Sequence, residues 1–248
     1  MMTSPLSPKS SCAVILAGGF GTRIRSVCPN LPKPMIPVAG EPFIAWVLRY
    51  LAGQGIPNFV ISLGYRAEVA EDYFRTRPTG GGSLQTVREN KPLGTGGALL
   101  MAEPLTETSD PVVLANGDSL VLADLSGAWR LLREESVDGV VIGIEVDDAS
   151  RYGRLETAAD GRLRRFDEKQ PGPAVINAGI YLFRRRLLHR FPQATPLSME
   201  RDVFPALLSG GAKLIVHRCR APFLDIGTPE SLGQADAFIR QHFRQVAA

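Results

Sequence analysis

A glycine-rich turn follows the first apolar run of the chain, which spans residues 13–17. The turn contains Gly18, Gly19 and Gly21. Glycines after a buried strand let backbone N–H groups approach a ligand closely, and open α/β sheets bind ligands at the carboxyl ends of their strands. The run GGFGT fits neither the phosphate loop GxxxxGK nor the dinucleotide pattern GxGxxG, whose third glycine is missing. The turn is therefore either purely structural or a loop that holds another kind of anion.

Two cations beyond the turn favour the anion-binding loop. Arg23 offers a planar fork of donors that suits phosphate oxygens. Lys33 stands between Pro32 and Pro34, which fix the backbone and limit the positions that its ammonium group can reach. A lone lysine is usually exposed to solvent. A lysine held between prolines, ten residues past this arginine, is less easily explained as an ordinary exposed residue.

Two aspartates end apolar segments elsewhere in the chain. Asp118 closes the run PVVLANGD, and Asp225 lies between an apolar segment and the Gly227–Thr228 turn that precedes the last predicted helix. Both therefore fall at strand ends, where α/β sheets gather their ligands. Taken singly, each is as well explained by a structural role, as a turn aspartate or as support for the first turn of a helix, as by ligand binding.

Composition limits the class of protein and its partners. Of 248 residues 44% are hydrophobic, which allows a sizeable core. The 28 basic and 25 acidic residues give a net charge of +3, so no strong field calls for a nucleic-acid or membrane partner. The basic runs 162–165 and 184–186 are better explained as solvated faces than as phosphate sites. Small-molecule substrates are the expected partners.

The same sequence features predict a cytoplasmic protein. No segment approaches the roughly 20 apolar residues that span a bilayer. Residues 1–11 are polar and contain prolines, which predicts a loose tail and not a signal peptide. Cys12, Cys28 and Cys219 are too far apart to form a CxxC pair, so we expect reduced thiols.

Short apolar runs alternate with helical patterns along the whole chain. The predicted strands are 13–18, 58–64, 83–90 at an edge, 111–118, 138–146, 174–183 and 212–219, with a hairpin over 153–168 that turns at Asp160–Gly161. The predicted helices are 42–55, 66–74, 94–103, 197–211 with Ser198 as cap, and 229–243 with Thr228 as cap and Pro229 in the first turn. This alternation predicts a single α/β domain, 12–248, whose mainly parallel sheet is covered on both faces and mixed near the hairpin.

Seven stretches of the chain, in order, resemble the sugar-1-phosphate nucleotidyltransferases. They are LAGGFGTRI with LPKPMIPVAGEP, KPLGTGGAL at 91–99, NGDS at 116–119, RYG at 151–153, FDEK at 166–169, NAGIYLF at 177–183 and FLDIGTPESL at 223–232. The likeness is greatest to the D-glycero-α-D-manno-heptose 1-phosphate guanylyltransferases. Mannose-1-phosphate guanylyltransferases are also similar, but many carry a C-terminal β-helix, and this chain has no hexapeptide repeat that predicts one. The resemblance implies a Rossmann-like α/β nucleotidyltransferase fold.

The resemblance also implies which residues bind each substrate. The nucleotide would contact Leu16, Ala17, Gly18, Gly19, Gly21, Thr22, Arg23, Lys33, Leu93, Gly94, Thr95, Asn116 and Gly117. The sugar 1-phosphate would contact Gly153, Glu168, Lys169, Asn177 and Gly179, with Lys169 on its phosphate. The catalytic residues would be Arg23, Lys33, Asp118 and Asp225. Inside the motifs NGDS and LDIG, the two aspartates would be ligands of Mg²⁺, which favours oxygen donors.

In the implied reaction, an oxygen of the sugar 1-phosphate attacks the α-phosphorus of a nucleoside triphosphate and pyrophosphate leaves. The nucleophile is already a phosphate oxygen, so catalysis needs positioning and charge neutralisation but no general base. Mg²⁺ would screen the repulsion between the two anionic substrates. His189, His217 and His242 lie outside every motif and are expected to be structural or surface residues.

Guanine is the favoured base and a heptose the favoured sugar. The run LGTGG resembles that of guanylyltransferases, with a glycine-rich helix start as the alternative explanation. We expect GTP and D-glycero-α-D-manno-heptose 1-phosphate to give GDP-heptose for surface-polysaccharide biosynthesis. The alternatives are a mannose-1-phosphate guanylyltransferase, an N-acetylmuramate-1-phosphate uridylyltransferase and a non-catalytic regulatory protein that binds nucleotide-sugars. The amphipathic last helix leaves a homo-oligomer open.

Overall fold

The computed structural model describes residues 6–21, 24, 27–76, 82–167 and 169–243. Its N-terminal half is a parallel sheet in which β1 lies between β4 and β6, and β5 forms the edge beside β4. These strands are β1 (Cys12–Ala17), β4 (Asn58–Leu63), β5 (Ser83–Arg88) and β6 (Val112–Asn116). The helices between them are α1 (Phe43–Gly53), α2 (Ala67–Arg75) and α3 (Gly94–Ala102). The predicted edge strand and the parallel order are confirmed.

The C-terminal half extends the same sheet with mixed pairing. Strand β11 (Ala174–Phe183) runs antiparallel to β6 and joins the two halves. Its other edge pairs with β8 (Gly139–Val146), which in turn runs parallel to β12 (Leu214–Cys219). The predicted hairpin is confirmed: β9 (Arg154–Thr157) and β10 (Leu163–Asp167) pair antiparallel, and Gly161 turns the chain at φ +80°. The central sheet is therefore mixed, as expected.

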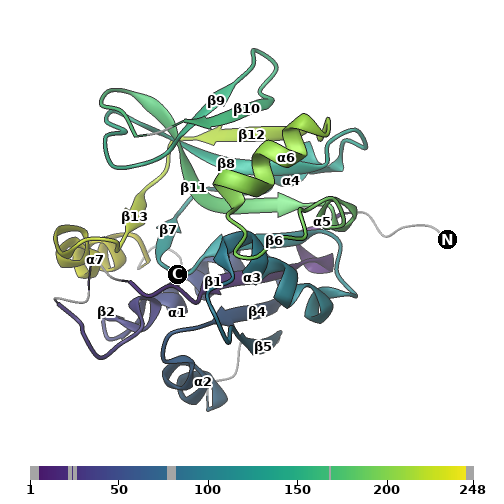
Figure 1. Cartoon of the computed structure of the whole chain (residues 1–248). Helices are drawn as coiled ribbons and strands as arrows, with labels where there is room; N and C mark the ends of the chain where they lie inside the picture. The colour runs from purple at the N-terminus through teal and green to yellow at the C-terminus, as the bar shows by residue number, and fades with distance from the viewer. Residues whose placement is uncertain (1–5, 22–23, 25–26, 77–81, 168, 244–248) are drawn as a thin grey trace.

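Each face of the sheet is covered by helices, which explains why the β1 sequence is apolar without interruption. Ala13, Ile15 and Ala17 face a core with α1, α2, α4 (Ser126–Arg133) and α7 (Pro229–His242). The alternate residues Cys12 and Val14 face a second core with α3, α5 (Arg185–Leu188) and α6 (Phe204–Ser209), the helices drawn in front of the sheet in Figure 1. Successive side chains of a strand point to opposite faces, so both sets are buried.

Two short ribbons lie outside the central sheet. Strands β2 (Pro37–Val38) and β3 (Glu41–Pro42) form one of them just before α1. Strands β7 (Ser119–Val121) and β13 (Phe223–Asp225) form the other, which directly follows β6 in the chain on one side and precedes α7 on the other. The second ribbon brings a late segment of the chain to the carboxyl end of a central strand.

The caps predicted for two helices are confirmed, but one helix is interrupted. Thr228 Oγ1 accepts a hydrogen bond from Ser231 N at 3.3 Å at the start of α7. Ser198 Oγ accepts from Arg201 N at 3.3 Å, yet the turn that follows, Met199–Val203, is π-helical before α6 begins at Phe204. Pro205 has no N–H group, and its ring would collide with a carbonyl one turn earlier, so an α-helix cannot run through it unbroken.

The segment before β1 packs on the domain. Pro8–Ser10 form a 3₁₀ turn, Ser10 Oγ donates to Asp110 O at 3.0 Å, and Arg133 Nε donates to Leu6 O at 3.2 Å. Residues 6–11 therefore have fixed contacts, although the sequence assigns them to a loose tail. The sequence of a segment does not indicate which distant side chains will bond to its main-chain carbonyls.

Other expectations from composition can be compared with the described residues. The three cysteines are free thiols, and burial raises the pKa of Cys12 to about 11. Within the described ranges, no helix combines the length and the apolar character needed to cross a membrane. His217 is half-buried in β12 beside Gly127, and desolvation lowers its pKa; His189 is exposed.

The basic run 184–186 is not the solvated face that its composition predicts. Arg184 donates to Val137 O at 2.7 Å, Leu132 O at 2.8 Å and Glu134 O at 3.0 Å, and so closes the end of α4. Arg185 bonds to Thr106 O and pairs with Glu103. Only Arg186 is exposed. In the run 162–165, by contrast, the arginines are exposed, and two of them form surface ion pairs.

Arg184→Met should destabilise the protein by about 1.5–3 kcal/mol, because three carbonyls lose a charged donor. Arg186→Met is the matched control: its ion pair with Asp138 is solvent-exposed on the arginine side and is expected to contribute about 0–1 kcal/mol. Urea unfolding of both variants measures the difference. Equal losses of stability in the two variants would contradict the structural role of Arg184.

Candidate active site

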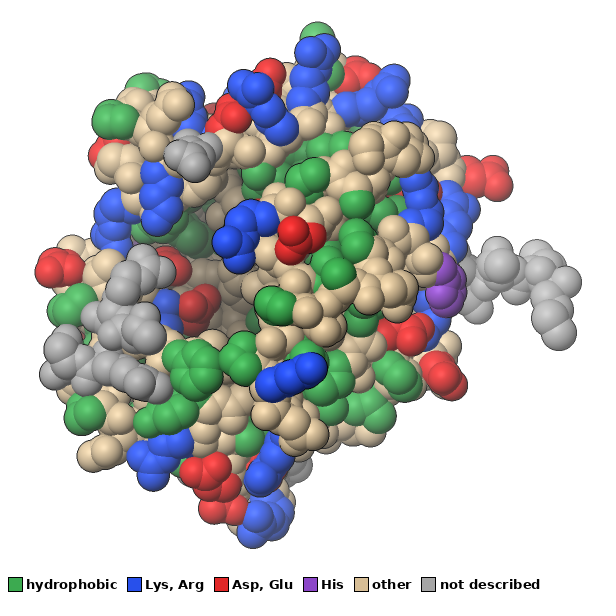
Figure 2. Space-filling view, in the orientation of Figure 1, with side chains coloured by type: hydrophobic (Ala, Val, Ile, Leu, Met, Phe, Trp, Pro, Cys, Tyr) green, Lys and Arg blue, Asp and Glu red, His purple; other side chains and the backbone are tan. Residues whose placement is uncertain are grey.

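A cavity of about 400 Å³ opens at the carboxyl ends of β1 and β6. Figure 2 shows this face hollowed, with acidic and basic side chains at the recess. The cavity is lined by Leu16, Ala17, Gly18, Gly19, Phe20, Gly21, Ile24, Lys33, Pro34, Glu89, Pro92, Gly94, Thr95, Ala98, Asn116, Asp118 and Gly227. Most of the residues predicted to bind a nucleotide are therefore brought together from four separate parts of the sequence.

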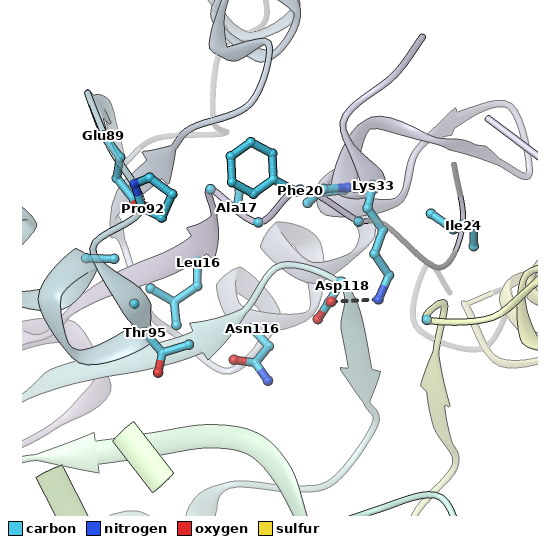
Figure 3. Close-up of a pocket in the computed structure, with 17 residues that line it drawn as sticks. Leu16, Ala17, Phe20, Ile24, Lys33, Glu89, Pro92, Thr95, Asn116 and Asp118 are labelled. Atoms are coloured by element: carbon cyan, nitrogen blue, oxygen red, sulfur yellow. Dashed lines mark hydrogen bonds and ion pairs between the residues drawn. The ribbon is translucent and has the colours of Figure 1, made fainter. Parts of the chain in front are cut away.

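Lys33 is the best-defined charge in the cavity. It begins a 3₁₀ turn, Lys33–Met35, and is only 9% exposed. Its Nζ donates to Asp118 Oδ2 at 2.7 Å, as Figure 3 shows. The alternative of a solvent-exposed lysine is therefore wrong. The flanking prolines limit the conformations of the turn, so little freedom remains to be lost when the ammonium group is fixed.

The two predicted aspartates come together through the ribbon of β7 and β13. Asp118 lies in the turn between β6 and β7, and its carbonyl accepts from Ile226 N at 3.0 Å. Asp225 ends β13 opposite Ser119, and its Oδ1 accepts from Gly227 N at 2.7 Å. Asp225 thus reaches the site through this ribbon and not from a strand of the central sheet.

Gly227 marks the point where the charged groups converge. A Cβ atom on Gly227 would lie 3.2 Å from Lys33 Nζ and would collide with Asp225 Oδ1. Within the described residues, no group of three or more His, Cys, Asp or Glu side chains could hold a metal ion. Two carboxylates nevertheless fit Mg²⁺, which commonly takes one or two carboxylates and completes its shell with phosphates and water.

Glu89 is a cavity residue that the sequence analysis missed. Its Oε1 accepts from Ser62 Oγ at 3.1 Å and its Oε2 accepts from Leu93 N at 3.1 Å. Gly18 packs directly against this carboxylate, because a Cβ there would collide with Oε1. Glu89 follows the edge strand β5 directly, so the rule that ligands gather at strand ends could have identified it.

Of the residues predicted to bind the sugar 1-phosphate, those that the structure describes (Gly153, Lys169, Asn177 and Gly179) are not in the cavity lining, but Gly179 touches it. Asn177 and Gly179 belong to an irregularity in β11, where the register with β8 shifts and Gly179 adopts φ +74°. A Cβ on Gly179 would come within 2.5 Å of Asn116 Nδ2, so the bulge touches a lining residue. Asn177 N donates to Gly153 O at 3.2 Å, and Lys169 is exposed just after β10.

Comparison with known proteins supplies the family. The nucleotidyl transferase family matches residues 12–242. This chain belongs to that family. It is 36% identical over 229 residues to a mannose-1-phosphate guanylyltransferase of Mycobacterium tuberculosis, covering 90% of this chain but 64% of that protein. It is 34% identical to a D-glycero-alpha-D-manno-heptose 1-phosphate guanylyltransferase of Aneurinibacillus thermoaerophilus, covering 93% of this chain and 99% of the relative.

A solved structure agrees with the sequence comparisons. The crystal structure of HddC from Yersinia pseudotuberculosis complexed with GMP-PN is similar to this nucleotidyltransferase with a TM-score of 0.81 and 32% identity. The match covers 91% of this chain and 98% of that one. The Rossmann-like nucleotidyltransferase fold expected from the sequence is confirmed.

The glycines of LGTGG in this nucleotidyltransferase are explained by packing. Gly94 has φ +76°, and a Cβ on it would lie 2.5 Å from Leu197 O. A Cβ on Gly96 would lie 2.8 Å from Val203 Cγ2, and Gly96 N donates to Leu197 O at 2.8 Å. The run is therefore a glycine-rich helix start that seats the segment 197–203, and its contact with the base stays a prediction. Gly94 also lines the cavity, so this packing positions the cavity wall.

Several predicted residues do not line the cavity. Leu93 and Gly117 are absent from the lining, although Gly117 N donates to Leu16 O at 2.9 Å beneath it. Thr22, Arg23 and Glu168 lie outside the described residues. In the described part of the chain, neither a histidine nor a cysteine lines the cavity. The lining offers a cation that can neutralise the charge of a phosphate, and carboxylates that could hold a divalent cation for the same purpose.

Proposed function

We propose that the protein is a sugar-1-phosphate guanylyltransferase, which transfers GMP from GTP to a sugar 1-phosphate and releases pyrophosphate. D-glycero-α-D-manno-heptose 1-phosphate is the first candidate for the acceptor, because this chain spans nearly the full length of the heptose-named relative. Mannose 1-phosphate is the second, because the mannose-named relative is 36% identical. The product GDP-heptose would serve the synthesis of a surface polysaccharide.

The carboxylate of Glu89 is the observation that carries the choice of guanine. Glu89 and Pro92 lie at the opposite end of the cavity from Lys33 and Asp118 in Figure 3, which suits a base at one end and phosphates at the other. An ionised carboxylate only accepts hydrogen bonds. The Watson–Crick edge of guanine offers two adjacent donors, N1–H and N2–H, whereas uracil and thymine offer one N–H between two carbonyls. Guanine is therefore the base that complements Glu89.

Charge neutralisation by Lys33 is the expected core of the mechanism. A phosphate oxygen of the acceptor attacks the α-phosphorus of GTP in line with the departing pyrophosphate, so no proton has to be removed first. The buried ammonium of Lys33 would stabilise the charge that builds on the α-phosphate, where a preorganised cation is worth more than in water. By the family resemblance, Arg23 would hold the pyrophosphate and Lys169 the phosphate of the sugar.

Asp118 and Asp225 would hold a Mg²⁺ ion in this proposal. Asp225 bonds to Gly227 N, and Lys33, which pairs with Asp118, packs against the same glycine, so both carboxylates lie about one ammonium group, which supports this assignment. Bound there, the ion would supply electrostatic screening between the two anionic substrates. Lys33 balances the charge of Asp118 in the structure, and the second carboxylate, Asp225, leaves a negative charge that a divalent cation would offset.

The proposed function is tested by a matrix of GTP, ATP, UTP and dTTP against the 1-phosphates of heptose, mannose and N-acetylmuramic acid, scored by pyrophosphate release. GTP with D-glycero-α-D-manno-heptose 1-phosphate should give the highest kcat/KM. GTP with mannose 1-phosphate as the best pair would replace the heptose with the second candidate. A preference for UTP or dTTP would overturn the guanylyl assignment, and no turnover of any pair would favour a regulatory protein.

The Glu89→Gln variant tests whether Glu89 determines the preference for guanine, when it is assayed with the same set of nucleotides. Glutamine keeps both local contacts, since its oxygen can accept from Leu93 N and the Ser62 hydroxyl can accept from its amide. The variant should lose about ten- to a hundredfold of the GTP preference, the size expected for a hydrogen bond to a charged group. Glu107→Gln is the control and should match the wild type, because Glu107 is exposed and follows the 3₁₀ turn Glu103–Thr106 after α3. An unchanged base preference in Glu89→Gln would contradict the assignment.

The two lysines should respond differently to substitution. Lys33→Ala should lower kcat with both substrates saturating, because its charge acts on the reacting phosphate. Lys169→Ala should mainly raise the KM of the sugar 1-phosphate, about ten- to a hundredfold for a lost charge-assisted contact. Steady-state kinetics separates the two effects, with the exposed Lys91→Ala as control. Wild-type kinetics in both variants would show that the roles are misassigned.

Removal of divalent metal should abolish turnover, and added Mg²⁺ should restore it. Asp118→Asn and Asp225→Asn should each be severely impaired at saturating Mg²⁺, because a neutral amide is a poorer ligand than a carboxylate. Asp124→Asn, an exposed helix-capping aspartate, is the control. Full turnover in excess EDTA, or near-normal rates in both site variants, would refute the metal site.

A further inference from the structure

Both amide hydrogens of Asn177 are used inside the protein. Its Nδ2 donates to Tyr181 Oη at 2.6 Å and to Glu200 Oε1 at 3.1 Å, and its Oδ1 accepts from Gly179 N at 3.0 Å. An amide group has two hydrogens to donate, so both are used. Asn177 therefore has no hydrogen left for a sugar hydroxyl, and it instead holds the groups around it.

The side of Asn177 that faces the core is fixed. Tyr181 is 2% exposed and lies among aromatic rings, with Phe183 stacked at 5.9 Å and Phe204 at 5.3 Å between ring centroids. Gly179 is pinned in the β11 bulge against Asn116. Because these neighbours cannot shift independently of the core, the second hydrogen of Asn177 defines a fixed direction toward Glu200.

The segment that carries Glu200 is fixed to the nucleotide side of the cavity. Leu197 N donates to Leu93 O at 2.7 Å, and Met199 N donates to Thr95 Oγ1 at 2.8 Å. Thr95 lines the cavity, as does Asn116 on the other side. Glu200 itself is exposed, and its second carboxylate oxygen has no hydrogen bond or ion pair within the described part of the chain. This oxygen is thus held one residue away from a contact with the cavity lining, and it remains available to a ligand.

A cation follows strand β10, which packs against the segment after Glu200. Phe166 of β10 stacks on Phe204 at 4.4 Å, which brings the end of β10 to the segment that follows Glu200. Lys169, just beyond β10, is exposed. A carboxylate repels a phosphate but accepts hydrogen bonds from hydroxyl groups, whereas an ammonium group attracts a phosphate. The two charges are therefore suited to opposite ends of one sugar phosphate.

We propose that Glu200 binds a ring hydroxyl of the sugar 1-phosphate and that Asn177 is a positioning residue for Glu200. This inference rests on the proposed function, since it names the group that recognises the acceptor of that reaction. The ligand chemistry is a neutral hydroxyl of a pyranose, donated to the free oxygen of Glu200. Asn177, which the family resemblance assigns to the hydroxyls, acts on them through Glu200.

The test measures sugar 1-phosphate kinetics in the full-length protein, with mannose 1-phosphate, the heptose 1-phosphate and the 2-, 3-, 4- and 6-deoxy analogues of mannose 1-phosphate as substrates. Glu200→Ala should raise the KM of the intact sugar about ten- to a hundredfold, with the KM of GTP unchanged. The wild type should discriminate against the analogue that lacks the bound hydroxyl, and Glu200→Ala should treat that analogue and the intact sugar alike. If Glu200 had only a structural role, its substitution would not remove the discrimination at one particular hydroxyl.

The positioning role of Asn177 is tested by a double substitution. Asn177→Ala should raise the KM of the sugar 1-phosphate in the wild-type background but not in the Glu200→Ala background, because the two residues act through one contact. Glu107→Gln again serves as the exposed control.

The outcomes separate this inference from the proposed function. If the wild type uses no sugar 1-phosphate, the proposed function falls. If the wild type turns these sugars over, and Glu200→Ala keeps both the wild-type KM and every penalty against the deoxy analogues, the inference about Glu200 alone is overturned. Because Glu200 is exposed, its substitution is compatible with a folded protein.

Discussion

The ion pair between Lys33 and Asp118 is the interaction around which the rest of the cavity is arranged. The residue Lys33 is only 9% exposed, so its ammonium group has lost most of its hydration. The carboxylate of Asp118, at 2.7 Å, offsets that loss. The pair requires the 3₁₀ turn at Lys33, the carboxyl end of β6 and the ribbon of β7 and β13 to meet at one point. A reaction between two anions needs a cation that is fixed away from water, because water would screen the charge of an exposed cation.

Close approach of backbone segments is the second constraint, and glycines satisfy it at three walls of the cavity. Gly18 admits the carboxylate of Glu89, Gly94 admits the carbonyl of Leu197, and Gly179 admits the amide of Asn116. In each case a Cβ atom would collide with a group from a distant part of the chain. The glycines therefore do more than turn the chain: they set how near the walls stand to one another, and hence the shape of the space between them.

The segment 197–203 connects the two halves of the site. Its first residues bond to the start of α3 on the nucleotide side, and Glu200 bonds to Asn177 in the β11 bulge on the other side. The π-helical turn that Pro205 enforces orients this segment. Because this segment touches both sides of the site, it fixes their positions relative to each other, and an in-line displacement depends chiefly on such positioning.

The amino-acid sequence alone determined the features that depend on neighbouring residues. The apolar runs of β1, β4 and β6, the hairpin at Gly161 and the caps Ser198 and Thr228 follow from local pattern and turn chemistry, and the family motifs supplied Lys33, Asp118 and the glycine loop. Only the tertiary structure decided that Arg184 closes α4, that Glu89 enters the cavity, that Asp225 arrives through a ribbon outside the central sheet, and that LGTGG seats a late segment. These features are contacts between residues far apart in the chain, and a side chain's type and local spacing do not specify which distant carbonyl, amide or backbone it will meet.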